Sequence, residues 1–182
     1  MDRFVIFKEF CEDNHIFSKE FCDNNHIFPE SFSVWLKENG FFTAPASTKY
    51  HGAYEGGLFD HSLQVCKRLI GLTLDNSLVW QRKESPVIVG LFHDLCKIDQ
   101  YIKLDGAYEY NTKVLLKGHG AKSIMLLSQF LTLTEEEIAC IRYHMGAYET
   151  EEWDEFDRAI RKYPNVLWTH HADQLASKID GV

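Results

Sequence analysis

Apolar residues recur at helical spacing along most of the chain. The clearest segment runs from about residue 59 to residue 74, where His61 shares a face with several apolar side chains and a second apolar face indicates burial. The same spacing, bounded by residues that start and stop helices, predicts further helices along the rest of the chain. They span residues 86–98, about 119–131, 134 to about 145, and 164 to about 175.

Local sequence signals mark where these elements begin and turn. Ser85-Pro86 has the form of an N-cap followed by Pro at the first helical position. Residues 134–137 spell a capping box. Between Tyr101 and Tyr110, alternating residues flank Asp105-Gly106, a strong signal for a two-residue hairpin turn. The chain is therefore predicted to be all-α, a helical bundle with one small β-hairpin insertion.

Residues 1–45 form a separate, Phe- and Asn-rich prefix that contains a short repeat. Residues 8–17 recur as residues 19–28, with the same Lys-Glu-Phe-Cys start and Asn-His-Ile-Phe end. This offset of 11 residues is about three helical turns, so equivalent residues share one face. We expect short helices with turns at the Asn-His steps, then a helix that stops at Asn39-Gly40. The prefix is predicted to be a helical N-terminal extension packed on the core of a domain formed by residues 46–182.

Composition and charge narrow the functional classes. The chain has 182 residues, with 19 Lys and Arg against 27 Asp and Glu and a net charge of −8. Its length suits one domain with a full hydrophobic core, and its charge disfavours binding to long nucleic acid. No apolar run approaches the roughly 18 residues of a membrane span, and the first residues show no signal-peptide pattern. Five widely spaced cysteines, an odd number, disfavour a disulfide framework and favour a cytoplasmic location.

Nine histidines are a high number for this length, which directs attention to metal or proton chemistry. Potential metal ligands fall on five predicted helices, an arrangement typical of a metal site inside a helical bundle. They are His61, His93, Asp94, His119, His144 and Asp173. The adjacent His93 and Asp94 can converge on one ion, with the carboxylate free to bridge to a second. Lys97 lies one turn further on the same face, where its positive charge can bind an anionic oxygen. The alternative interpretation is that Lys97 is exposed and is favoured at the end of the helix by the helix dipole.

The sequence around these residues contains four short motifs. They are HGAYEGGLFDH at residues 51–61, LFHDLCK at residues 91–97, Gly118-His119 and Ala172-Asp173. Together they resemble the HD-domain superfamily of metal-dependent phosphohydrolases, whose pattern is a His, a His-Asp doublet and a distant Asp. The resemblance covers roughly residues 46–180. It is closest to the HD domains of bacterial 3′-to-5′ exoribonucleases and relaxase-associated proteins.

The resemblance implies a ligand set for each of two ions. A first ion is expected to bind His61, His93, Asp94 and Asp173. In the dinuclear branch of the superfamily, Asp94 bridges to a second ion that binds His119 and His144. Many relatives carry His-His where this chain has Tyr143-His144, so one ligand fewer is expected here. Mixed imidazole and carboxylate ligands suit one or two ions of Mn, Fe, Co, Ni or Zn better than Ca or Mg.

The implied activity is hydrolysis of a phosphomonoester or phosphodiester, in a nucleotide or another small phosphate ester, by a metal-activated water. Asp94 and Lys97 are the predicted catalytic residues, and Lys97 and His51, at the pocket mouth, are the predicted substrate contacts. Three alternatives stay open: a 3′-to-5′ exonuclease on short oligonucleotides, an HD-type diiron oxygenase, and a non-catalytic, metal-stabilised ligand-sensing module. The acidic residues 149–157 are expected to form a solvated rim.

Overall fold

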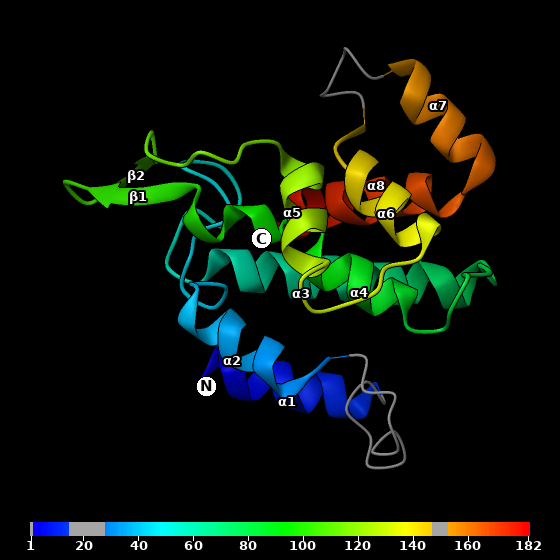
Figure 1. Cartoon of the computed structure of the whole chain (residues 1–182), viewed down its shortest axis with the longest axis horizontal. Coiled ribbons are helices and arrows are strands. Elements are labelled where there is room, and N and C mark those ends of the chain that lie inside the picture. Colours follow the sequence, from blue (N-terminus) through cyan, green and yellow to red (C-terminus); the bar gives the residue numbers. More distant parts are fainter. Residues whose placement is uncertain (1, 15–27, 147–152) are drawn as a thin grey trace.

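Helices form most of the regular structure (Figure 1). The computed structural model describes residues 2–14, 28–146 and 153–182, and within them the prediction of an all-α chain with one small hairpin is confirmed. The helices are α1 (Arg3–Asp13), α2 (Glu30–Glu38), α3 (Gly57–Asp75), α4 (Ser85–Phe92), α5 (His119–Leu127), α6 (Glu135–Tyr143), α7 (Trp153–Lys162) and α8 (Asn165–Gln174). A 3₁₀ turn, η2 (Leu95–Asp99), follows α4, and a π-helical turn, η5 (Leu175–Asp180), continues α8.

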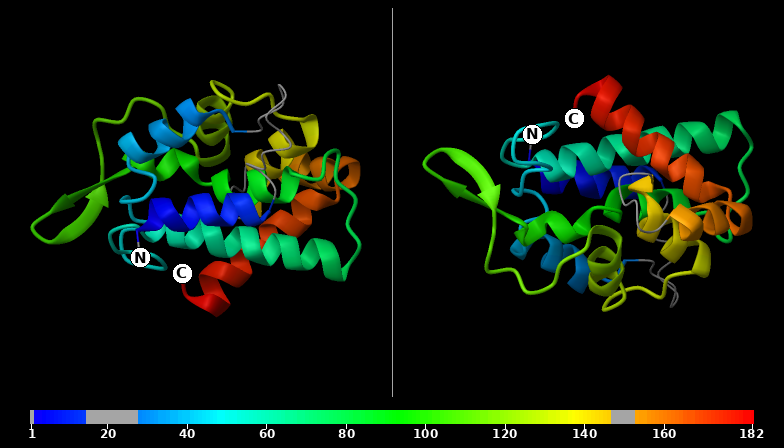
Figure 2. Two further views of the ribbon diagram at one scale, coloured as in Figure 1. Left: turned by 90° about the horizontal axis from the view of Figure 1, so that it is seen from below. Right: turned by 90° about the horizontal axis from the view of Figure 1, so that it is seen from above.

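The hairpin has the predicted two-residue turn at Asp105-Gly106. Strands β1 (Tyr101–Leu104) and β2 (Ala107–Tyr110) pair antiparallel, with Tyr101 opposite Tyr110. Asp105 and Gly106 both have positive φ, at 49° and 87°, as a type I′ turn requires. Figure 2 shows that the hairpin projects from one end of the helical body.

Helices α3 and α4 pack side by side at the centre of the bundle (Figure 1). Gly90 of α4 permits this close approach, because a Cβ at this position would lie 2.5 Å from the Cα of Cys66 on α3. The apolar side chains between the two helices, such as Val65 and Ile88, are buried. His61 lies on the same buried side of α3, as its spacing predicted.

Two predicted features of α4 are wrong. Ser85 is the first residue of the helix rather than its N-cap, because its hydroxyl donates to Glu137 Oε1 at 2.8 Å in a buried network. The helix ends at Phe92 rather than at residue 98, and the chain turns at His93 and Asp94 before η2 begins. Leaving the helix at this point lets two consecutive side chains face one site, which adjacent positions of a straight helix do not do.

Of three other predicted helix boundaries, the structure confirms two. The capping box at the start of α6 is confirmed, because Thr134 Oγ1 accepts from the Glu137 N–H at 3.2 Å and Glu137 Oε2 accepts from the Thr134 N–H at 2.9 Å. Helix α5 ends at Leu127, shorter than the predicted 119–131. Helix α2 ends before Asn39-Gly40 as predicted, with Gly40 at φ +89°.

The N-terminal helices share the apolar core with the rest of the chain. Phe7 of α1 is fully buried, with its ring centroid 5.6 Å from that of Phe42 and 6.5 Å from that of Phe92. Of the second copy of the repeat, only Phe28 lies within the described residues, and its ring centroid is 5.3 Å from that of Phe92. The division of the chain at residue 45 stays a prediction.

Helix α7 was not predicted. Its apolar residues Trp153, Phe156 and Ile160 are spaced for one helical face, but they stand among acidic residues that suggested only a solvated rim. The acidic residues of the described part, at 154, 155 and 157, are exposed, while Phe156 is buried. Residues 149–152 lie outside the described residues. Within the described chain, no helix combines the length and the apolar character needed to cross a membrane.

Candidate metal centre

The structure brings the predicted ligands together from five helices around the carboxylate of Asp94. They are His61 in the first turns of α3, His93 and Asp94 just beyond α4, His119 at the start of α5, His144 just beyond α6, and Asp173 near the end of α8. All are buried except His119, whose side chain is 29% exposed. The site is thus closed on most sides and open beside His119.

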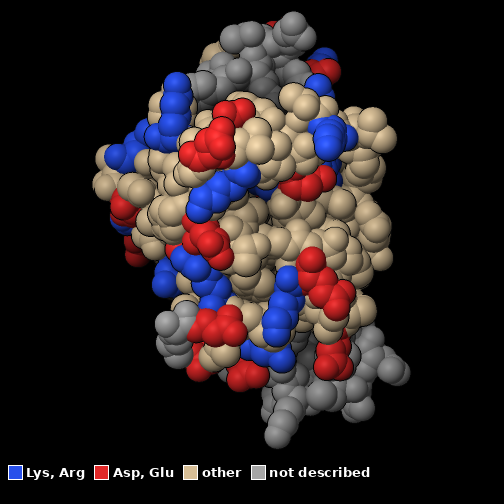
Figure 3. Space-filling view, turned by 90° about the vertical axis from the view of Figure 1, so that its left-hand side faces the viewer, with Lys and Arg blue, Asp and Glu red and all other residues tan. Residues whose placement is uncertain are grey.

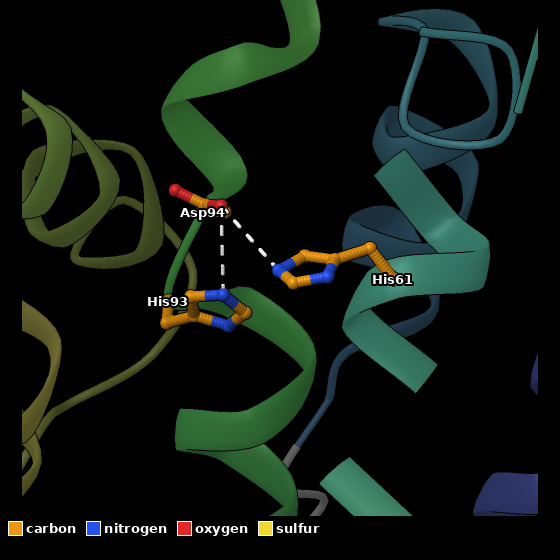
Figure 4. Close-up of side chains that lie close together, drawn as sticks. All are labelled: His61, His93 and Asp94. Atoms are coloured by element: carbon orange, nitrogen blue, oxygen red, sulfur yellow. Dashed lines mark ion pairs between the residues drawn. The ribbon is translucent and has the colours of Figure 1, made fainter. Parts of the chain in front are cut away.

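One oxygen of Asp94 faces the first group of predicted ligands. Asp94 Oδ2 lies 3.5 Å from Nε2 of His93 and 3.8 Å from Nε2 of His61 (Figure 4). The ligand atoms of these three residues all lie within 4.8 Å of one another. Asp173 joins them through His61, whose Nε2 is 3.2 Å from Asp173 Oδ1. Such spacings suit an ion with ligand bonds of about 2.0–2.2 Å after a small contraction.

The other oxygen of Asp94 faces the second group. Asp94 Oδ1 lies 3.4 Å from Nε2 of His144 and 3.7 Å from Nδ1 of His119. Each carboxylate oxygen therefore has its own pair of imidazoles. This is the geometry that a carboxylate bridging two ions needs.

Backbone oxygens set the tautomer of three of these histidines, that is, which ring nitrogen carries the hydrogen. The Nδ1 atoms of His61, His93 and His144 lie at hydrogen-bond distance from main-chain oxygens. The acceptors are Val182 at 2.9 Å, Gly90 at 3.0 Å and Ile141 at 2.8 Å, respectively. Because an oxygen acceptor requires Nδ1–H, each neutral ring keeps the lone pair on Nε2, which is the atom that points into the site.

Most of the atoms that would bind an ion lack hydrogen bonds within the described residues. Nε2 of His61, His93 and His144 and Oδ1 of Asp94 are buried without a hydrogen bond. An unsatisfied buried polar atom costs roughly 1–3 kcal/mol, so four in one cluster would be a heavy loss unless something binds them. The donor set therefore fits a metal ion, and the identity of that metal stays a prediction.

Lys97 lies inside this cluster. The lysine is only 6% exposed, and its Nζ is 2.6 Å from Asp94 Oδ2, so the alternative of an exposed lysine is wrong. Burial alone would lower the pKa of Lys97, but the Asp94 carboxylate outweighs it and the pKa stays above its usual value. Burial alone would raise the pKa of Asp94, but Lys97 and then His93 outweigh it and hold that pKa well below its usual range. The two residues form a buried ion pair.

Two further histidines border the site. The ring centroid of His51 is 4.8 Å from that of His61, and His51 is half-buried; its place at the pocket mouth and its contact with substrate stay predictions. Burial, together with the neighbouring His61 and Lys97, lowers the pKa of His51 to about 4, so it is neutral at pH 7. His170 Nδ1 lies 2.7 Å from the backbone oxygen of His144 and so helps to fix the end of α6.

Cys96 belongs to the cluster but was missed in the sequence. Its thiol, with Asp94 and His119, forms a second group whose ligand atoms all lie within 4.8 Å of one another. The sulfur is 3.9 Å from His119 Nδ1, and the residue is 1% exposed. The sequence signal that could have identified Cys96 as a potential ligand was its position two residues after Asp94, within the LFHDLCK motif.

No protein-family model, curated protein or solved structure matches this chain. The donor atoms of the site are therefore what indicates its chemistry.

A cavity of about 310 Å³ borders the cluster at His119, and its wall includes neither Asp94 nor the predicted substrate contacts Lys97 and His51. Its wall includes His119 and the base of the hairpin, with the polar side chains of Gln100, Asn111, Lys117 and Lys122. Lys122 is itself buried and forms an ion pair with Asp99. Figure 3 shows the hairpin end of the molecule, where basic and acidic side chains are interspersed rather than segregated.

Proposed function

We propose that this protein is a metal-dependent phosphohydrolase that cleaves a phosphomonoester or phosphodiester in a nucleotide or another small phosphate ester. The observation that carries the proposal is the two-sided carboxylate of Asp94, with imidazoles facing each oxygen and a buried lysine beside it. The resemblance of the four short sequence motifs to those of the HD-domain superfamily supports the same conclusion.

Each part of the cluster has a role in this proposal. His61, His93, Asp94 and Asp173 would hold a first ion, and Asp94, His119 and His144 a second. Ions bound there would supply an acidified water and offset charge on the phosphoryl oxygens. Imidazole and carboxylate ligands suit Mn, Fe, Co, Ni or Zn.

Lys97 supports an anionic substrate. Its Nζ contacts the Asp94 oxygen that faces His61 and His93, so an ion bound there would take over most of the negative charge of that oxygen. The ammonium would then be buried without a full counter-charge, which is costly. A phosphoryl oxygen next to the ions would supply that counter-charge and be held by a charge-assisted hydrogen bond.

The cavity supports a small substrate. A volume of about 310 Å³ is at the lower end of the roughly 300–1,000 Å³ found for small-molecule sites. The exposed Lys117 at its edge favours an anionic ligand, while the net charge of −8 opposes long polyanions. Cleavage at the end of a short oligonucleotide uses the same chemistry and is the second candidate.

The test uses the full chain, stripped with EDTA and reloaded separately with Mn²⁺, Fe²⁺, Co²⁺, Ni²⁺ or Zn²⁺. Each form is incubated with p-nitrophenyl phosphate, bis(p-nitrophenyl) phosphate, nucleotides, cyclic nucleotides and end-labelled short oligonucleotides. We expect product release that requires metal and is lost in Asp94→Ala. His171→Ala is the control, because His171 is an exposed residue of α8 outside the ligand set.

The other outcomes separate the alternatives. Shortening of oligonucleotides without cleavage of small esters identifies the exonuclease. Oxygen consumption that depends on iron identifies the oxygenase. Metal binding without any turnover identifies the sensing module, and a protein that binds none of these ions excludes the metal centre.

A further inference from the structure

The sulfur of Cys96 lies on the same side of Asp94 as His119. We propose that Cys96 binds the second ion as a thiolate, together with Asp94 and His119, so that this position selects Zn²⁺, Co²⁺ or Fe²⁺ over Mn²⁺ and Mg²⁺. Soft sulfur ligands favour the former ions, whereas oxygen-only ligands suit the latter. The inference rests on the metal centre of the proposed function.

The geometry is close to that of an occupied site. Cys96 Sγ lies 3.9 Å from His119 Nδ1, and His119 Nδ1 lies 3.7 Å from Asp94 Oδ1. With Zn–S of about 2.3 Å and Zn–N of about 2.0 Å, a tetrahedral angle places S and N about 3.6 Å apart. A shift of a few tenths of an ångström therefore brings the sulfur and the imidazole to the spacing of two ligands of one ion, and the ligand atoms of all three residues lie within 4.8 Å of one another. Asp94 Oδ1, which would complete the trio, is buried and has no hydrogen bond within the described chain.

Neighbouring contacts hold these donors in place. Cys96 belongs to η2 and His119 begins α5, and two polar contacts join these elements. The Cys96 N–H donates to Ser123 Oγ at 3.0 Å, and Lys122 forms an ion pair with Asp99. The thiol and the imidazole thus approach the carboxylate from two elements that are already clamped together, which lowers the ordering cost of binding.

The surroundings of Cys96 differ from those of the other cysteines in the described chain. Burial raises the pKa of the thiols of Cys11, Cys66 and Cys140, and none of the three belongs to a group of potential ligands. Cys96 is equally buried but has an imidazole and a carboxylate beside it. When the ion binds, the thiol proton of Cys96 and the Nδ1 proton of His119 pass to solvent, and the lone pairs that this frees form the metal bonds, with no change in oxidation state.

Cobalt provides a direct readout of sulfur ligation. The EDTA-treated full chain is titrated with Co²⁺, and thiolate-to-cobalt charge transfer is followed in the near ultraviolet. We expect this absorbance in the wild-type protein and in Cys140→Ala, the matched buried control. It should be absent in Cys96→Ala and Cys96→Ser, while the first Co²⁺ still binds. The second Zn²⁺ should bind at least about tenfold more weakly in Cys96→Ala, while Mn²⁺ affinity changes little.

A measurement without substitutions guards against misfolded variants. X-ray absorption of the wild-type protein with two equivalents of Zn²⁺ should show a sulfur ligand at about 2.3 Å. A shell of nitrogen and oxygen only, or two Co²⁺ steps without charge transfer, overturns the role of Cys96 and leaves the metal centre standing. Failure to bind either ion overturns the proposed metal centre itself.

Discussion

The ion pair between Lys97 and Asp94 predicts a specific loss of stability in the metal-free protein. Asp94→Asn keeps the side-chain shape but removes the charge that faces Lys97 Nζ at 2.6 Å, and Lys97 is only 6% exposed. Breaking a buried pair by removing one partner costs about 3–5 kcal/mol, a large share of the roughly 5–15 kcal/mol that stabilises a domain. For a chain of this size, the melting temperature should fall by about 6–20 °C.

The reciprocal change should cost less. Lys97→Met leaves Asp94 with a second positive neighbour, because Asp94 and then Cys96, which both lie close to the ring of His119, raise the pKa of His119 to about 10 and keep it protonated at pH 7. In the double variant Asp94→Asn, Lys97→Met, neither position carries a buried charge that has lost its partner. Its loss of stability should therefore be smaller than the sum of the two single losses, by about 2–3 kcal/mol.

Urea unfolding in EDTA at pH 7, followed by circular dichroism, measures this double-mutant cycle. The exposed Lys67→Met on α3 is the control and should change stability by no more than about 0.5 kcal/mol. A coupling energy below about 0.5 kcal/mol would show that the pair is not formed in solution and would refute the reasoning.

Three further predictions concern the ions and the chain end. Lys97→Met should bind the first ion more tightly, because the lysine no longer competes for Asp94, yet release phosphate about 10- to 150-fold more slowly; calorimetry and phosphate assays test both parts. His144→Ala should lose the weaker of two Mn²⁺ binding steps, and two unchanged steps would contradict its role. Hydrogen bonds from Arg68 and then Gln64 lower the pKa of Asp180 to about 2, so its carboxylate stabilises the fold above about pH 4, and this contribution disappears as pH falls through 2. The difference in melting temperature between wild type and Asp180→Asn should shrink over that range, and a constant difference would contradict it.

Most of the helices could be predicted because their signals are local. The apolar spacing of α3, the capping box of α6 and the Asp105-Gly106 turn each depend on a few neighbouring residues, and the structure bears them out. Ser85 was misassigned because its hydroxyl bonds to Glu137, a residue far along the chain. Helix α7 was missed because its apolar spacing is interrupted by many acidic residues.

The same distinction holds in the candidate site. The resemblance to the HD-domain superfamily implied that Asp94 bridges two ions, and the two oxygens of Asp94 do face different imidazoles. The acceptors for His93 and His144 lie three residues earlier in the chain, so helix geometry alone could have supplied them. The acceptor for His61 is 121 residues away, and the approach of Cys96 to His119 depends on how η2 packs against α5. Contacts of that kind are set by the tertiary fold.

The start of α3 is where both described ends of the chain are tied down. Arg3 forms an ion pair with Asp60 at 2.8 Å, and the backbone oxygen of Val182 is 2.9 Å from Nδ1 of the next residue, His61. A purification tag joined beside residue 2 or residue 182 would therefore be attached close to an imidazole of the candidate metal centre. A polyhistidine tag would add its own ligands at that point, so elemental measurements on the tagged protein would count ions held by the tag. Cleaving the tag, or using one without histidine, makes metal content a property of the protein alone.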